Sequence, residues 1–243
     1  MLVKLENPKT LANAIGIISE LVVEVRIKFN EEGMNIVAID PANVAMVEFK
    51  LPRTSFSQFD IDDKEVLGVN LDNLKRILKR AGSKSTLILE TQENVLKIQI
   101  QDRVKRSFSL SLIDVTSEDK EMPSLDFKSK IKLNSVDFIA SVEDCSVVAD
   151  ACSFIVEEGG KFVIHAKGLN SAKAEFSGDE AEINAEPCKS RYSLEYLQKF
   201  LKGAKLTDKT FLKFSADHPL RVEFANEFMK LNFVLAPRVE TED

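Results

Sequence analysis

The sequence predicts an α+β protein in which one chain holds two similar domains. The first observation is a short amphipathic helix over residues 71–84, with apolar side chains at spacings of three, four and seven and cations on its other side. The second is that this apolar pattern returns after 123 residues. The third is that segments with alternating apolar residues, typical of half-buried strands, surround both helices. The matching positions are Leu71, Leu74, Ile77 and Leu78, then Leu194, Leu197, Phe200 and Leu201.

The first half begins with a predicted helix over residues 10–22, whose buried stripe is Leu11, Ile15, Ile18 and Val22. Glycine, proline and acidic turns then separate predicted strands at 24–30, 34–39, 44–51 and 65–69. The basic helix follows, and Gly82 is expected to cap its C-terminus. Further strands are predicted at 86–91, 95–101 and 104–113.

The second half repeats this order. A third helix over 134–150 carries the stripe Phe138, Val142, Cys145 and Ala149, offset by 127 residues from the first stripe. Strands at 210–215, 220–225 and 228–235 echo those after the basic helix. Residues 116–126 are polar and acidic and contain a proline, which predicts an extended connection over the surface. The expected division is 1–115, a connecting loop 116–126, and 127–243.

Composition limits the class of protein. The 243 residues carry a net charge of −6, so a chain that coats nucleic acid with its whole surface is not expected, although one local basic surface is compatible. No apolar run reaches the roughly 18 residues of a membrane span, and no signal peptide is evident. We expect a cytoplasmic protein, or a nuclear one if the cell has a nucleus. Three cysteines without metal-type spacing are expected to be reduced.

Catalytic and metal-binding patterns are missing from the sequence. His165 and His218 have no cysteine or carboxylate at ligand spacing, and each is interpreted as structural. The glycine-rich phosphate loops and the nucleophile elbow do not occur. The sequence therefore predicts a protein that is not an enzyme and needs no metal or cofactor.

Two strands are candidates for exposed sheet edges: the one that carries Phe108, Leu110 and Leu112, and residues 172–176 in the second half. Unpaired edges favour pairing with another chain. An edge in each half permits head-to-tail assembly, which closes into a ring if the rotation per subunit divides a circle.

Four segments resemble the DNA polymerase sliding clamp family of the proliferating cell nuclear antigen type, especially its archaeal members. These are Ala38-Ile39-Asp40-Pro41-Ala42-Asn43-Val44-Ala45-Met46-Val47, Gly68-Val69-Asn70-Leu71, Leu112-Ile113-Asp114-Val115 and Leu235-Ala236-Pro237-Arg238-Val239. The resemblance implies two DNA-clamp domains per chain, each with two helices on antiparallel sheets. It also implies a closed ring of three chains that surrounds duplex DNA and tethers DNA polymerase, with helices lining the hole.

The resemblance assigns sequence-independent DNA contacts to the cations of these helices, since long flexible cations suit a sliding contact with phosphates. The expected DNA-facing residues are Lys9, Lys75, Arg76, Lys79, Arg80, Lys84, Lys199, Lys202 and Lys205. The first helix offers little beyond Lys9, and the third offers no cation.

The resemblance also implies a pocket beside the connecting loop. There, DNA polymerase, the clamp loader, a flap nuclease and DNA ligase would insert a short motif with a glutamine and aromatic anchors. Val234 is smaller than the aromatic residue of some relatives, which bears on the shape of the pocket. The expected pocket residues are Ile39, Val44, Met46, Met122, Pro123, Leu125, Pro219, Leu220, Val234, Leu235, Ala236 and Pro237.

The acids of the third helix have two interpretations, solvated charge or an ion-pair network with Arg80 or Arg106 of a neighbouring subunit. The expected interface residues are Arg80, Arg106, Phe108, Leu110, Asp137, Glu143, Asp144, Ala172 and Ala174. The leading hypothesis is a homotrimeric clamp, and the first alternative is one subunit of a heterotrimeric ring. A hydrolase or binding domain on a duplicated α+β scaffold is the alternative from another class.

Overall fold

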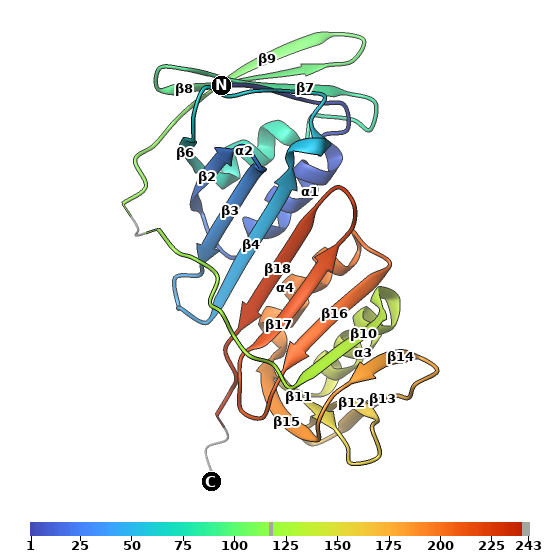
Figure 1. Cartoon of the computed structure of the whole chain (residues 1–243). Helices are drawn as coiled ribbons and strands as arrows, with labels where there is room; N and C mark the ends of the chain where they lie inside the picture. The colour runs from blue at the N-terminus through green and yellow to red at the C-terminus, as the bar shows by residue number, and fades with distance from the viewer. Residues whose placement is uncertain (117–118, 240–243) are drawn as a thin grey trace. The chain divides into compact units, whose positions relative to one another are not determined.

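A computed structural model describes residues 1–116 and 119–239, and the predicted connecting-loop residues 117–118 and the last four residues lie outside the described part. Its elements alternate as strands, helix, strands, helix and strands in each half of the chain (Figure 1). In the first half they are β1 (Leu2–Leu5), α1 (Lys9–Ile18), β2 (Glu24–Asn30), β3 (Gly33–Ile39), β4 (Ala45–Pro52), the 3₁₀ turn η1 (Arg53–Ser55), β5 (Gln58–Asp60), β6 (Glu65–Asn70), α2 (Leu71–Leu78), β7 (Thr86–Gln92), β8 (Val95–Gln101) and β9 (Lys105–Ser111). In the second half they are β10 (Ser129–Asn134), α3 (Ser135–Val148), β11 (Ala151–Val156), β12 (Phe162–Lys167), β13 (Ser171–Phe176), β14 (Ala181–Asn184), β15 (Cys188–Ser193), α4 (Leu194–Ala204), β16 (Lys209–Phe214), β17 (Leu220–Ala225) and β18 (Lys230–Leu235).

The chain forms two compact units. The N-terminal unit contains Met1–Pro41, Val47–Met122 and the turn segment Asn226–Leu231, and the C-terminal unit contains the remainder. The division at Met122 lies inside the segment 116–126 that we expect to connect the domains. Two short segments cross over: Ala42–Met46 belongs to the C-terminal unit and Asn226–Leu231 to the N-terminal unit.

Sheet order confirms the duplication. In the N-terminal unit, strands follow one another as β5-β1-β7-β8-β9 and as β4-β3-β2-β6. In the C-terminal unit the orders are β14-β10-β16-β17-β18 and β13-β12-β11-β15, so every strand has a counterpart at the same place. The α+β fold class with two similar domains, predicted from the repeat, is confirmed.

Each unit buries the predicted helix stripes against its sheets. Leu11, Ile15 and Ile18 of α1 are at most 2% exposed, and the same holds for their counterparts Phe138 and Cys145 on α3. The helix α3 packs beside α4 and contacts strands of both sheets of its unit. In that core, the Phe154 ring lies edge-on to Tyr192 at 5.3 Å and to Phe162 at 5.6 Å between ring centroids. Burial of these aromatic and aliphatic side chains is the main stabilising term.

Several strands were not predicted from the sequence. The strands β1 and β10 precede the first helix of each unit, and β5 has three residues. The predicted helix 10–22 ends at Ile18, where Ser19 caps it and residues 19–21 form a turn. The predicted Gly82 cap is also wrong, because α2 ends at Leu78 with Lys79 as its C-cap residue. Gly82 instead donates its backbone N–H to Ser85 Oγ at 2.8 Å.

Candidate nucleic-acid and partner-binding surfaces

The helix α2 presents a basic face to solvent. Asn70 caps its N-terminus by accepting a hydrogen bond from the Asn73 N–H at 3.1 Å. Leu71, Leu74 and Leu78 are buried, which orients the opposite side of the helix outward. The exposed predicted cations of this segment are Arg76, Lys79, Arg80 and Lys84.

Two residues of the basic segment take part in hydrogen bonds to neighbouring parts of the unit, Lys75 through its side chain and Arg80 through its backbone carbonyl. Lys75 is half-buried, and its Nζ donates a hydrogen bond to Ser19 Oγ at 2.8 Å, which ties α2 to the end of α1. The backbone carbonyl of Arg80 accepts from Arg106 Nη1 at 3.1 Å, and the Arg106 guanidinium also pairs with Asp102. These bonds hold the basic segment in place while the Arg80 side chain remains exposed.

The second pair of helices carries charges of both signs. On α4, Lys199 pairs with Glu195 at 3.1 Å and lies over the Tyr196 ring at 4.9 Å from the centroid, whereas Lys202 and Lys205 are exposed. Lys9, at the start of α1, is exposed as well. The predicted cations are therefore most numerous on α2 and the turn after it, residues 75–84, with a smaller group on α4 and at Lys205.

The acidic positions of α3 lie at its outer surface. Asp137 accepts a hydrogen bond from Asn134 Nδ2 at 3.0 Å, and Glu143 and Asp144 are exposed. Just beyond α3, Asp150 pairs with Arg238 at 2.9 Å, and this guanidinium lowers the pKa of the Asp150 carboxyl. That ion pair attaches the segment after β18 to the C-terminal unit.

The connecting segment is fastened to β2, which the sequence analysis did not anticipate. Asp119 lies 2.9 Å from Lys28 Nζ and 3.3 Å from Arg26 Nη1, and Arg26 also donates to the Val115 carbonyl. The hydrogen bond and positive charge of Lys28, and next those of Arg26, lower the pKa of Asp119. Two features of the sequence could have indicated this contact. Arg26 and Lys28 lie on one face of a predicted strand, and the connecting segment is acidic.

The same segment passes very close to β6. The Ile113 N–H donates to the Gly68 carbonyl at 2.9 Å, and a side chain at Gly68 would place its Cβ 2.0 Å from the Ile113 carbonyl oxygen. Glycine is therefore required sterically at this position.

Of the residues predicted for the partner pocket, Ile39 and Met122 belong to the N-terminal unit and the other ten to the C-terminal unit. Within the C-terminal unit, the Ala236 N–H donates to the Val44 carbonyl at 2.9 Å, which brings two of the predicted segments together. Leu220, Val234 and Leu235 are buried in the unit core. The half-buried members of this unit are Val44, Met46, Pro123, Leu125, Pro219, Ala236 and Pro237.

The predicted interface strands lie at the ends of their sheets. β9 pairs with β8 and is the last strand of its sheet. β13 pairs with β12 and is likewise the last strand of its sheet. Phe108 is half-buried and Leu110 buried on one side of β9, while Ala172 and Ala174 are half-buried on β13. The outer side of β13 carries an ion pair between Lys173 and Glu175, which raises the pKa of the lysine and lowers that of the glutamate.

Over the described residues, no cluster of three or more histidine, cysteine or acidic side chains is arranged to hold a metal ion. His218 instead has a structural setting: its carbonyl accepts a hydrogen bond from Tyr192 Oη at 2.8 Å, and its ring lies 5.9 Å from that of Phe127. Within the same residues, no helix has the length and apolar character needed to cross a membrane.

Two copies of one α+β domain, each with two helices packed on antiparallel sheets, define the DNA-clamp class of folds. Family models agree: residues 1–120 match the proliferating cell nuclear antigen N-terminal domain, and residues 121–239 match the C-terminal domain. The chain belongs to the proliferating cell nuclear antigen family.

Individual relatives support the same conclusion. The chain is 36% identical over 242 residues to the DNA polymerase sliding clamp 1 of Thermococcus kodakarensis and 35% identical over 243 residues to the DNA polymerase sliding clamp of Pyrococcus furiosus, with 97% of each chain covered. It also resembles the solved PCNA2-PCNA3 complex of Sulfolobus tokodaii, with 25% identity, a TM-score of 0.88, and coverage of 99% of this chain and 100% of that one. The antigen of Entamoeba histolytica shares the fold, with 23% identity, a TM-score of 0.91 and 98% of each chain covered.

Proposed function

We propose that this chain is a DNA polymerase sliding clamp, a non-enzymatic ring subunit that encircles duplex DNA and holds polymerase on its template. The observation that carries the proposal is the exposed cation cluster of α2 on a chain whose net charge is −6. The names of the archaeal relatives, DNA polymerase sliding clamp, support it.

The charge distribution suits such a role. Duplex DNA carries about one negative charge per 1.7 Å of its axis, so exposed cations attract it without reading base sequence. Arg76, Lys79, Lys202 and Lys205 are exposed, so they would exchange between phosphates as the ring slides. An excess of acidic residues elsewhere would discourage DNA from binding the outer surface.

Assembly would use the edges of β9 and β13. The N–H and C=O groups of an edge strand are available to another chain, and Phe108, Leu110, Ala172 and Ala174 would add apolar contacts. We propose three chains arranged head to tail. In this arrangement Asp137, Glu143 and Asp144 would face Arg80 or Arg106 of the next subunit, at about 0–1 kcal/mol for each exposed pair.

Partner proteins, including polymerase, clamp loader, flap nuclease and ligase, would bind through a glutamine-aromatic motif beside the connecting segment. The half-buried apolar residues of the C-terminal unit, Met46 and Leu125 among them, would contact the aromatic anchors.

Topology provides the test. The purified chain is loaded by its clamp loader onto nicked circular plasmid, washed in high salt and then exposed to a restriction enzyme that linearises the DNA. A clamp stays on the circle and is released from the linear product, whereas a protein that stays on both or neither contradicts the proposal.

The alternative of a heterotrimer subunit is favoured by one observation, the absence of cations from α3. Light scattering of the purified chain at low and high salt separates the two cases. A mass of three chains supports the homotrimer, and a persistent monomer at both salt concentrations supports required partner chains.

A further inference from the structure

One sheet of the C-terminal unit has a basic outer face. The helices α3 and α4 pack on one side of β10, β16 and β17, so alternate side chains of these strands and of β14 point outward (Figure 1). The four strands carry five cations and two acids, all on this outer face, in a chain whose net charge is −6. None of these residues belongs to the surfaces proposed for DNA, partner motif or subunit contact. The cations are Lys130, Lys132, Lys209, Lys213 and Arg221, and the acids are Glu182 and Glu223.

The basic character belongs to this copy of the domain alone. The counterpart strands of the N-terminal unit are β5, β1, β7 and β8, and they carry Lys4 and Lys97 together with Asp60 and Glu90. Their charges therefore balance. Both sheets have the same strand order and the same alternation of buried side chains. Packing of the unit therefore does not require the excess of lysine.

Three of the cations lie directly side by side. In the strand register Lys213 is opposite Lys130 on one side and Arg221 on the other. Like charges at such positions destabilise a sheet, because their Cβ atoms are only about 4.5–5.5 Å apart. Glu223 lies 2.8 Å from Lys213 Nζ and 3.4 Å from Arg221 Nε, which offsets part of the repulsion. Lys130 has no ion-pair partner among the described residues. The row therefore keeps a positive charge that an anion would neutralise.

Lys209 adds a second cation without a carboxylate partner, since its Nζ donates to the neutral Asn134 Oδ1 at 2.8 Å. Lys132 differs, because it pairs with Glu182 at 2.7 Å. Its Nζ also lies over the Phe211 ring, 5.9 Å from the centroid. The ammonium thus occupies the place over the ring that a stacked nucleic-acid base would need. The face favours charge recognition over base stacking.

An open cavity of 270 Å³ lies over β14, β10 and β16 among these charges. Lys130, Lys132, Lys213 and Phe211 line it, and each of them is exposed or half-buried, so a ligand can reach them. Neighbouring strands are about 4.8 Å apart, and alternate residues along one strand about 6.6 Å. The cations are therefore spread more widely than one phosphate or carboxylate group can span. An extended polyanion matches this distribution.

We infer that this basic face binds an extended acidic segment of a partner protein. Carboxylates on alternate residues of such a segment repeat at the spacing of Lys130 and Lys132 on β10. Phe211, between the lysines of β16, would contact the apolar part of the segment. Glu182 and Glu223 lie at the two ends of one cross-strand row and would repel a broad array of phosphates, whereas a single peptide strand fits between them.

Calorimetry on the full chain tests the inference with a short acetylated peptide of alternating glutamate and threonine. We expect saturable binding that weakens as the salt concentration rises, because the contacts are between exposed charges. The same peptide with glutamine in place of glutamate should bind at least tenfold more weakly. Equal binding of the two peptides to the unaltered protein would overturn the inference.

Two double variants locate the site. Lys130→Gln with Lys209→Gln should bind the acidic peptide at least tenfold more weakly and keep its thermal unfolding temperature, since both side chains are exposed. The matched control, Lys4→Gln with Lys97→Gln, removes the same charge from the equivalent face of the N-terminal unit and should bind like the unaltered protein. Unchanged affinity of the first variant, or equal losses in both, would contradict the inference.

An oligothymidine is the competing probe. Tighter binding of this oligonucleotide than of the peptide, lost in the variant of Lys130 and Lys209, would assign the face to nucleic acid and overturn the inference. We expect its binding to be insensitive to that variant. Retention on circular plasmid is measured separately, so a failure here would leave the clamp proposal standing.

Discussion

The ammonium group of Lys75 donates a hydrogen bond to the hydroxyl of Ser19 at 2.8 Å. A cation predicted from the sequence to contact DNA therefore joins α2 to the residue that caps α1. Its neighbours Arg76, Lys79 and Arg80 are exposed. The basic helix thus divides into one structural lysine and three cations that are available to a polyanion.

The first prediction concerns DNA. Replacing Arg76, Lys79 and Arg80 together by alanine should weaken clamp-stimulated primer extension. It should also lower the slope of log affinity against log salt by about 0.9 for each phosphate that is no longer neutralised. Adding Lys75→Ala should contribute less to DNA affinity and more to the decrease in thermal stability.

The matched control replaces three exposed lysines of turns and strand ends, Lys64, Lys161 and Lys167. Equal effects of the two triple variants would remove α2 from the DNA role.

The second prediction concerns the partner pocket. Met46→Ala combined with Leu125→Ala removes two half-buried apolar side chains and should weaken binding of a glutamine-aromatic peptide by tenfold or more, or about 1.4 kcal/mol. Isothermal titration calorimetry measures the affinity. Leu169→Ala, which truncates a fully exposed leucine in the turn between β12 and β13, is the control. Unaltered affinity in the double variant would place the peptide site elsewhere.

The third prediction concerns the connecting segment. Since Lys28 and Arg26 lower the pKa of Asp119 in the folded protein, their ion pairs stabilise the attachment above the ordinary carboxyl pKa of 3.8. This stabilisation is lost as the pH falls through the lowered value. The Asp119 side chain is 60% exposed, so its contribution is at most about 1 kcal/mol.

Hydrogen exchange of the amides around Val115 measures this attachment. Asp119→Asn should accelerate exchange there at pH 7, and high salt should do the same to the unaltered protein. Asp126→Asn, at an exposed position of the same segment, should leave exchange unchanged. Identical exchange in the two variants would show that the ion pairs do not fasten the segment.

The fourth prediction concerns Gly68. An alanine there would place its Cβ 2.0 Å from the Ile113 carbonyl oxygen, so backbone must move and Gly68→Ala should destabilise the protein by about 1–3 kcal/mol. Gly16→Ala is the matched comparison, because nothing lies within 4 Å of its added methyl group and α1 should gain up to about 1 kcal/mol. Urea unfolding measures both. Similar stabilities of the two variants would contradict the close approach.

The apolar periodicity predicted most of the fold because it records burial directly. Leu71, Leu74 and Leu78, and their counterparts Leu194, Leu197 and Leu201, are all buried. Short strands escaped prediction because three or four residues cannot display a period, as β5 and β1 illustrate. The early end of α1 was not predicted either, because Val22 is buried just after the turn and continues the apolar stripe of the helix in the sequence.

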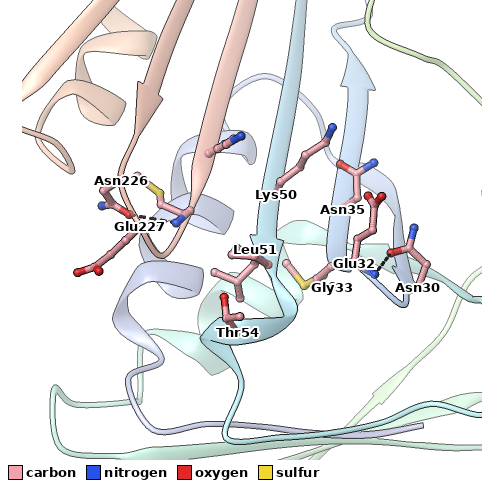
Figure 2. Close-up of a pocket in the computed structure, with 13 residues that line it drawn as sticks. Asn30, Glu32, Gly33, Asn35, Lys50, Leu51, Thr54, Asn226 and Glu227 are labelled. Atoms are coloured by element: carbon pink, nitrogen blue, oxygen red, sulfur yellow. Dashed lines mark hydrogen bonds between the residues drawn. The ribbon is translucent and has the colours of Figure 1, made fainter.

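Sites assembled from distant segments were less accessible to sequence reasoning. One cavity of the N-terminal unit, which Asn35 and Leu51 line, is formed by residues near 30, 50 and 226 (Figure 2). No spacing in the sequence relates these three segments. The contact between Asp119 and Lys28 likewise depends on where an irregular segment crosses a strand. The family motif around Met46 was recognisable, because it occupies one continuous run of sequence.

The helices α1 and α3 hold equivalent positions in the two units, and they are alike only in the apolar side chains that face the core. Leu11 and Phe138 fill corresponding core sites, while one outward face carries Lys9 and the other carries Glu143 and Asp144. Packing and electrostatics are therefore separable in this architecture. Substitutions on the outward face of either helix could therefore change the strength of its contact with DNA, and with it the rate of sliding, without a change in the core side chains.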